Sequence, residues 1–156
     1  MPRLDDLSEV VRKTLLGLPC FDKDDAPATL LAKPLSESKL ALVTSAGVHM
    51  RGDKPFGGGD QSFRAFASDA RAQDIIQSHT SIGFDRSGFM DDMNISVPLD
   101  RLRELREQGV IGSLAETFYS FMGAQRDPRQ IADETAPEVA RLLVAAGVDV
   151  VVLTPS

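Results

Sequence analysis

The sequence predicts an α/β fold, with a mostly parallel central sheet flanked by helices in a single three-layer domain. The strongest strand signals are two apolar, β-branched runs at residues 39–44 and 148–153, whose composition is typical of buried strands. Between them, segments with apolar residues at three- and four-residue steps alternate with shorter extended segments. Such alternation of strands and helices is typical of a parallel sheet.

Residues 1–36 are expected to form an N-terminal helix and a connecting arm ahead of the α/β domain at residues 37–156. Residues 3–16 are predicted to be helical, because apolar residues recur there at helical spacing: Leu4, Leu7, Val11 and Leu15. Residues 17–36 contain Pro19, Pro27 and Pro34 but no periodic pattern, which indicates an arm across the surface.

The first half of the domain is predicted from strand and turn signals. The strand at 39–44 runs into the small residues Ser45–Gly47, and a loop rich in glycine follows at 51–61. Alternation predicts a short strand at 62–67, and Ile75 begins a further extended segment. Residues 80–97 are polar, and we expect them to be irregular.

The second half repeats the pattern. Pro98 is expected to open a helix that Gly109 ends, and a strand is centred on residues 114–119. Another helical stretch begins at Asp127-Pro128 and is interrupted or restarted at Pro137. The last β-branched run is predicted to lie in the middle of the sheet.

Composition excludes several classes of protein. Lys and Arg number 17 against 23 Asp and Glu among 156 residues, a net charge of -6, which disfavours nucleic acids and anionic membranes as partners. No apolar run is long enough to span a bilayer. The N-terminus carries acids where a signal peptide needs a basic start, so we expect a cytoplasmic protein.

The sequence predicts neither a metal site nor a reactive thiol. Cys20 is the single cysteine, which excludes an internal disulfide, and acidic neighbours such as Asp22 disfavour its thiolate. His49 and His79 are far apart in the sequence, and no third ligand accompanies them.

Ligands of parallel sheets bind beyond the carboxyl ends of the strands. Three segments have this position: Thr44–Gly47, Tyr119–Gly123 and Thr154–Ser156. The substrate-binding candidates from the first two segments are Thr44, Ser45, Gly47, Tyr119 and Ser120. The last two are equally well explained as a strand end with core aromatics.

A polar loop supplies the remaining candidates, His79, Asp92 and Asn94. His79 would act as an acid, base or ligand, and the other two would orient it. The alternative is a solvated loop in which the Asp and Asn side chains bond their own backbone. Nearby, Gly57–Gly59 lacks the Lys-Ser/Thr of a phosphate-binding loop, which favours a lid or a plain turn.

Several stretches, in order, resemble one known family. They are Lys33–Ser36 leading to Ala41–Val48, Asp92–Asn94 leading to Pro98–Leu102 and Gly109–Gly112, Tyr119–Gly123, Ala146–Asp149 and Leu153–Pro155. Together they are similar to the selenoprotein B family of glycine, sarcosine, betaine and D-proline reductases, from about residue 33 to the end.

The resemblance implies a reductase that cleaves C–N bonds of amino-acid-type substrates, with selenocysteine as nucleophile and a dithiol as electron donor. It places a selenocysteine or cysteine after the strand at 148–153, beyond Ser156, so no catalytic residue is assigned. We therefore expect that the reading frame continues past a UGA codon and that these 156 residues are inactive alone. No cofactor is expected in this chain.

The resemblance also implies a small-molecule substrate and a reductase partner subunit. Two other hypotheses remain open. One is a non-catalytic small-molecule-binding or assembly module, which would form a homodimer. The other is a hydrolase or metal enzyme that uses His79 and the polar residues Asp91–Asn94.

Overall fold

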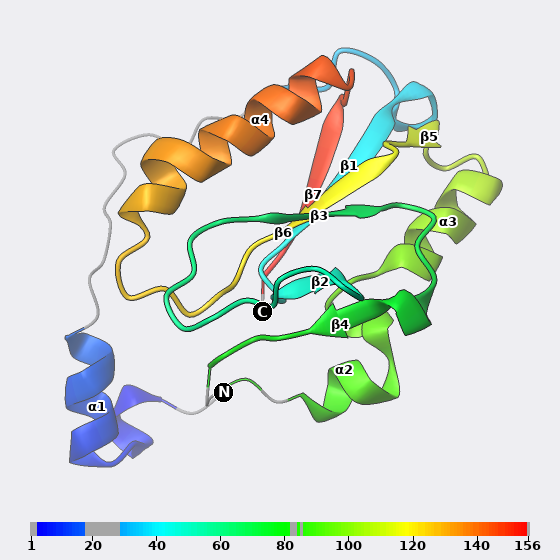
Figure 1. Cartoon of the computed structure of the whole chain (residues 1–156). Coiled ribbons are helices and arrows are strands. Elements are labelled where there is room, and N and C mark those ends of the chain that lie inside the picture. Colours follow the sequence, from blue (N-terminus) through cyan, green and yellow to red (C-terminus); the bar gives the residue numbers. More distant parts are fainter. Residues whose placement is uncertain (1–2, 18–28, 82–83, 85, 156) are drawn as a thin grey trace.

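Parallel pairing around β1 (Lys39–Thr44) builds the centre of the molecule in the computed structural model, which describes residues 3–17, 29–81, 84 and 86–155 (Figure 1). On one side β1 pairs with β7 (Val150–Thr154). On its other side it pairs with β5 (Ser113–Leu114) and then β6 (Thr117–Ser120). All three pairings are parallel, which confirms the predicted fold class.

The sheet is not purely parallel. β3 (Arg64–Ala67) pairs with β6 in the antiparallel direction and ends the sheet on that side. A separate pair, β2 (Val48–Met50) and β4 (Ile75–Gln77), is also antiparallel. The chain therefore leaves β1 and curls away from the sheet before it returns through β3.

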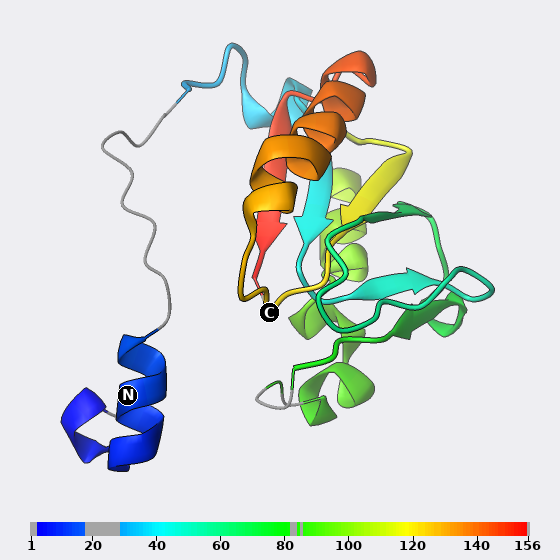
Figure 2. The ribbon, with the colours of Figure 1, turned by 60° about the vertical axis from the view of Figure 1, so that its left-hand side comes forward.

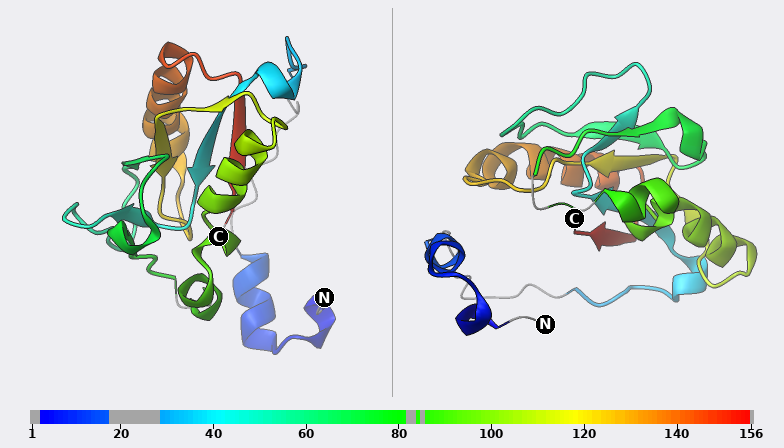
Figure 3. Two further views of the ribbon diagram at one scale, coloured as in Figure 1. Left: turned by 90° about the vertical axis from the view of Figure 1, so that its right-hand side faces the viewer. Right: turned by 90° about the horizontal axis from the view of Figure 1, so that it is seen from below.

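Two helices cover opposite faces of the sheet (Figure 3). α3 (Leu99–Glu107) buries Leu99 and Leu102 on one face, and α4 (Ala136–Ala145) buries Val139 and Leu143 on the other. This arrangement gives three layers, as the sequence predicts.

The helical stretch before α4 is widened into a π-helix at Ile131–Thr135. The widening ends at Ala136, whose N–H bonds the carbonyl of Ile131. The following residue, Pro137, has no N–H to continue a regular ladder. The interruption that the sequence indicates at Pro137 thus takes the form of a wider turn within one continuous helix.

The core lies mainly between the sheet and the two helices. Ala41 and Leu42 of β1 and Phe118 of β6 are fully buried. Other buried members come from elements far apart in sequence: Val48, Phe66, Ile75, Val97, Leu99, Ile111, Ala115, Val139 and Leu143. The apolar runs that predict strands are therefore the ones that fill the core.

The expected central position of the last strand is wrong for the part of the chain that the structure describes. β7 pairs only with β1 there and forms an edge, and its residues alternate between partial and greater exposure. A β-branched run has the composition of a buried strand, but composition does not report how many neighbours a strand has.

The polar segment at residues 80–97 contains more regular structure than predicted. It holds α2 (Ser87–Asp91) and a 3-10 turn, η4 (Met93–Ile95). The turn forms because the Asp92 side chain accepts a hydrogen bond from the Asn94 N–H at its start. Two further 3-10 turns lie at η2 (Leu35–Glu37) and η3 (Ala72–Asp74).

The N-terminal helix is shorter than predicted. A 3-10 turn, η1 (Leu4–Asp6), precedes α1 (Glu9–Leu16), which Ser8 caps. None of the residues of α1 is buried, and Figure 2 shows it apart from the sheet. Cys20 lies outside the described residues. No helix in the described ranges is both long enough and apolar enough to cross a membrane.

Candidate functional site

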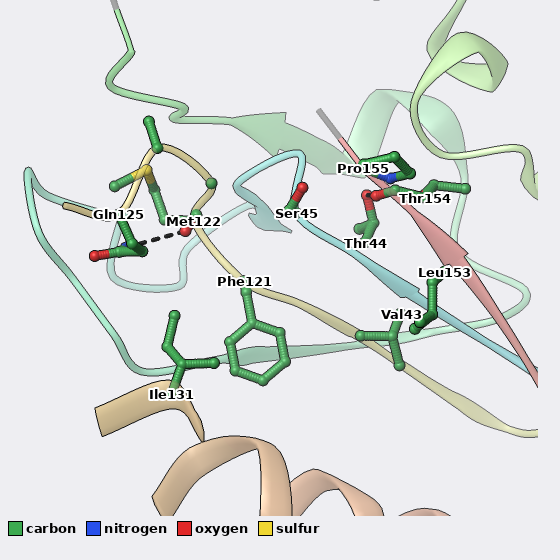
Figure 4. Close-up of a pocket in the computed structure, with 12 residues that line it drawn as sticks. Val43, Thr44, Ser45, Phe121, Met122, Gln125, Ile131, Leu153, Thr154 and Pro155 are labelled. Carbon is green, nitrogen blue, oxygen red and sulfur yellow. Dashed lines mark hydrogen bonds between the residues drawn. The ribbon is translucent and has the colours of Figure 1, made fainter. Parts of the chain in front are cut away.

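A cleft of about 630 Å³ opens where β1, β6 and β7 end (Figure 4). Each of the three strands, or the residues directly after it, contributes to its wall. The lining residues are Val43, Thr44, Ser45, Phe121, Met122, Gly123, Ala124, Gln125, Ile131, Leu153, Thr154 and Pro155. The cleft therefore occupies the place where parallel sheets bind ligands.

Backbone hydrogen bonds fix the three strand ends to one another. Ser45 N–H donates to the carbonyl of Thr154 at 3.0 Å, and Gly123 N–H donates to the carbonyl of Ser45 at 2.9 Å. Phe121 N–H donates to the carbonyl of Thr44 at 2.8 Å. A wall held in this way is preorganised, because a ligand would not have to order it.

The cleft is apolar, and none of its lining residues is ionisable. Phe121, Ile131 and Val43 present carbon surface to it, and Leu153 lies beside Val43 (Figure 4). Polar groups come from side chains such as Ser45 and Gln125. The described wall can bind and orient a small molecule, but it contains no acid, base or thiol to react with it.

Two of the candidates predicted from sequence line this cleft, Thr44 and Ser45. The Thr44 side chain is 2% exposed, and its hydroxyl lies 3.3 Å from the carbonyls of both Ser96 and Thr154. It also accepts a hydrogen bond from the Ala46 N–H at 3.1 Å. Thr44 thus ties β1 to β7 and to the segment before α3, and Ser45 is the better placed to meet a ligand.

Gly47 and His79 lie against each other behind the cleft wall. Gly47 has a φ of +64°, and a Cβ built on it would lie 3.1 Å from the Cα of His79. Glycine is therefore required there by both backbone conformation and space. Neither residue lines the cleft.

His79 is buried, with 2% of its surface exposed. Its ring stacks on Phe84 at 4.4 Å, and its Nδ1 accepts from the Ser81 N–H at 3.3 Å. Burial lowers the pKa of His79, and the positive charge of Arg86 lowers it further, so the imidazole is neutral at pH 7. Its Nε2 has no hydrogen-bond partner among the residues that the structure describes.

Tyr119 and Ser120 are buried parts of β6 and do not line the cleft. Ser120 Oγ accepts from the Val48 N–H at 2.9 Å, which ties β2 to the sheet. The Tyr119 ring packs edge-on against Phe63, and burial raises the pKa of its hydroxyl. Both residues are therefore core side chains at the end of a strand.

Asp92 and Asn94 lie at a separate surface depression beside α2 and α3. Asn94 Oδ1 accepts from the Asp100 N–H at 2.9 Å, within the first turn of α3. Its Nδ2 donates to Asp92 Oδ1 at 2.9 Å and to Asp100 Oδ2 at 3.0 Å. These bonds satisfy backbone N–H groups at the starts of η4 and α3. Asp92 and Asn94 line neither the cleft nor the surroundings of His79.

Some lining residues could not be chosen from sequence. Phe121, Met122, Thr154 and Pro155 fall in the segments expected at strand ends, but three of these side chains are apolar and the Thr154 hydroxyl bonds the carbonyl of Ser96, so none carries a distinct chemical signal. Ile131 and Gln125 come from the stretch that precedes α4, and only the fold places them at the cleft. The described residues contain no group of three or more His, Cys, Asp or Glu side chains placed to bind a metal.

Comparisons with known proteins agree on one family. A sequence profile of the family described as "Glycine/sarcosine/betaine reductase selenoprotein B" matches residues 4–156. The D-proline reductase subunit gamma of Acetoanaerobium sticklandii is 42% identical over 127 residues, which are 81% of this chain and 52% of that protein.

Two other relatives come from Peptoclostridium acidaminophilum. Its glycine reductase complex component B subunit gamma is 35% identical over 91% of this chain and 33% of its own length. Its betaine reductase complex component B subunit beta is 30% identical over 97% of this chain and 35% of its own length. The chain thus spans a third to a half of the length of these relatives. No solved structure matches it.

Proposed function

Because this chain belongs to the glycine, sarcosine and betaine reductase selenoprotein B family, we propose that it forms the substrate-side part of a reductase acting on C–N bonds of amino-acid-type substrates. In this proposal the cleft at the ends of β1, β6 and β7 holds the substrate. A selenocysteine or cysteine after β7 attacks it, and a dithiol supplies the electrons.

One observation carries the proposal: the end of β7 lines the apolar cleft at the ends of the parallel strands. Thr154 and Pro155 are part of the wall, and Leu153 lies beside Val43 (Figure 4). A residue that follows this strand would therefore start at the mouth of the cleft. A nucleophile there would meet a substrate whose position the three strand ends had already fixed.

The composition of the cleft supports a nucleophile that comes from outside its described wall. The lining has no ionisable side chain, and Cys20 is the single cysteine of the sequence. A selenol is ionised at neutral pH, whereas an ordinary thiol is mostly protonated, so a selenocysteine would not need a base in this wall to activate it.

We further propose that the chain works in a complex with other subunits. Relatives are named as subunits of glycine and betaine reductase complexes. In this chain the open edge of β7 supports such a role, because among the described strands β7 pairs only with β1. The apolar side chains Leu153 and Val151 on this strand are 71% and 38% exposed. The same edge is what favours the alternative of a non-catalytic assembly module.

Ligand binding to the isotope-labelled 156-residue protein tests the substrate site. Glycine, sarcosine, betaine and D-proline are added in turn, and amide chemical shifts are followed. We expect at least one of them to shift Ser45, Phe121 and Thr154 together. Failure of all four to perturb these amides at millimolar concentration would rule out the cleft as the substrate site.

An activity assay tests the source of the nucleophile. The purified chain with Cys20→Ser, supplied with dithiothreitol and any of the four compounds, is expected to cleave no C–N bond. Release of an amine, or ring opening of D-proline, would show that this chain suffices without Cys20 and that the mechanism is wrong.

A further inference from the structure

A second, polar cavity of about 550 Å³ adjoins the apolar cleft. Its wall combines the glycine-rich turn with the segment that follows β6, and it shares Ala124 and Gln125 with the cleft. The lining residues are Gly58, Gly59, Gln61, Thr80, Ser81, Ala124, Gln125, Arg126 and Asp127. One turn of the backbone thus separates an apolar space from a polar one.

The turn between the two spaces is held in an unfavourable conformation. Ala124 has a φ of 56°, a left-handed value that is unfavourable for a residue with a Cβ. The Gln125 side chain holds the turn in place. Its Nε2 donates to the carbonyl of Met122 at 3.0 Å and to the carbonyl of Asp60 at 2.8 Å.

The opposite wall is also fixed, although it leaves open space. Gln61 Oε1 accepts from the Ile131 N–H at 3.3 Å, and the Gln61 carbonyl accepts from the Thr135 hydroxyl at 2.9 Å. Nothing lies within 4 Å of a Cβ built on Gly58 or Gly59. The glycine-rich turn is therefore anchored at its end while its middle lines an unfilled space.

The charges around the cavity leave one cation uncompensated. Asp127 pairs with Arg129, whose hydrogen bonds lower the pKa of the carboxyl to about 2 and keep it ionised. Asp60 pairs with Arg64 at 3.0 Å. Arg126 is exposed and, within the described part of the chain, its guanidinium has neither a carboxylate nor a carbonyl partner. Every other arginine that the structure describes at residues 29–155 has a carboxylate or a carbonyl as its partner.

We propose that this cavity is an anion subsite, in which Arg126 binds the carboxylate of a small ligand whose apolar body lies in the adjoining cleft. A guanidinium is suited to this role because its paired N–H groups match the two oxygens of a carboxylate. The Thr80 hydroxyl lines the same space. The identity of the ligand body rests on the proposed function, whereas the anion subsite does not.

Acetate is the first probe, because it tests the subsite without the cleft. Acetate and the neutral acetamide are titrated into the labelled protein at constant ionic strength, and amide shifts are followed. We expect acetate, and not acetamide, to shift Gly58, Gly59 and Arg126. Arg126→Gln should raise the acetate Kd about tenfold, the size of a lost charged hydrogen bond.

Arg106→Gln is the matched control, since it removes the same charge from exposed Arg106 at the far end of α3, outside both cavities. It should leave the acetate Kd within about twofold, because screening by salt weakens distant charges. Equal effects of the two substitutions, or equal shifts by acetate and acetamide, would overturn the subsite.

D-proline and the carboxylate-free D-prolinol then test the link between the two spaces. We expect D-proline to bind more tightly than D-prolinol in the wild type and equally in Arg126→Gln. D-proline binding in the cleft with no effect of Arg126→Gln would overturn the subsite and leave the proposed function standing. Acetate binding that depends on Arg126, without binding of any of the four amino-acid-type compounds, would support the subsite and overturn the proposed function.

Discussion

His79 is a buried titratable side chain that the proposed chemistry does not use. Its pKa lies below the ordinary value of 6.5 because of burial and, secondarily, the charge of Arg86. The unfolded chain takes up a proton at this side chain as the pH falls through about 6.5, while the folded protein does not. The contribution of His79 to the free energy of unfolding is thus fully present above pH 6.5 and is lost as the pH falls below that value.

We therefore expect the free energy of unfolding to fall between pH 6.5 and the folded pKa of His79, by at most about 1.4 kcal/mol per pH unit. Urea denaturation at several pH values measures this slope. His79→Gln should flatten it, because glutamine does not titrate. A titration midpoint of the His79 ring at or above 6.5 in the folded protein would contradict the prediction.

Carboxylates contribute to folding stability in a different pH range. Asp127 has a pKa of about 2 because of hydrogen bonds from Arg129, and the pKa of Asp149 is lowered chiefly by a hydrogen bond from Lys33. Their contributions are present at neutral pH and are lost only as the pH falls below about 4. A stability loss near pH 6 can therefore be attributed to histidine.

Gly112 is packed against the start of β1 so closely that no side chain fits. A Cβ built on it would lie 2.7 Å from the carbonyl carbon of Glu37 and 2.9 Å from the Ser38 nitrogen. Both contacts are with backbone of the segment before β1, so relief requires that backbone to move away from Gly112. We expect Gly112→Ala to cost about 1–3 kcal/mol in the free energy of unfolding.

Gly57→Ala is the matched control for that substitution. Nothing lies within 4 Å of a Cβ built on Gly57, and its φ is not in the left-handed region. The change should alter the free energy of unfolding by no more than about 0.5 kcal/mol. Urea denaturation of both variants provides the comparison. Equal free energies of unfolding would show that the backbone before β1 makes room for a side chain at residue 112 without loss of stability.

At the scale of elements, β7 combines an exposed edge with an end at the cleft. Ser45 N–H bonds the carbonyl of Thr154, and Thr44 is paired with Thr154, so Thr154 and every second residue before it should direct their N–H groups toward β1. We expect the amides of Val152 and Thr154 to be protected from hydrogen exchange in the isolated chain. The amides of Val151 and Leu153 should exchange much faster, because they face the open edge.

Hydrogen exchange also reports on assembly. Protection of Val151 and Leu153 that appears only when a partner subunit is added would indicate that another strand covers this edge. Equal protection of all four amides at every concentration of the isolated chain would instead show that the edge is already covered.

At the scale of the whole molecule, the described residues of the N-terminal segment are exposed. None of those before Ser38 is buried, and α1 keeps an exposed apolar stripe that includes Val11 and Leu15. Among the described residues, the Lys33–Asp149 ion pair at 2.8 Å links this segment to the domain. The division near residue 36 stays a prediction.

Deletion of residues 1–28 tests this division, because it retains Lys33 and removes α1. We expect the melting temperature of the truncated protein to stay within about 2 °C of that of the whole chain, since no buried apolar area is lost. The control is a Lys33→Ala variant of the whole chain, which should also change little because the ion pair is exposed. A fall of more than 5 °C on deletion would show that α1 packs on the domain in solution.

The sequence by itself determined the fold class, the elements that fill the core and the family. Continuous apolar runs such as 39–44 become buried strands wherever they pair, and Leu99 with Leu102 gives α3 one buried face. These outcomes depend on local spacing and composition, which a sequence displays directly.

Only the tertiary structure decided which residues share a site and which strand is an edge. Asn94 caps α3, His79 lies behind the cleft wall against Gly47, and Ile131 reaches the cleft from the start of the α4 region. A side chain's role at a strand end depends on its neighbours from distant segments. Those neighbours are set by pairing and packing, which leave no mark in local sequence.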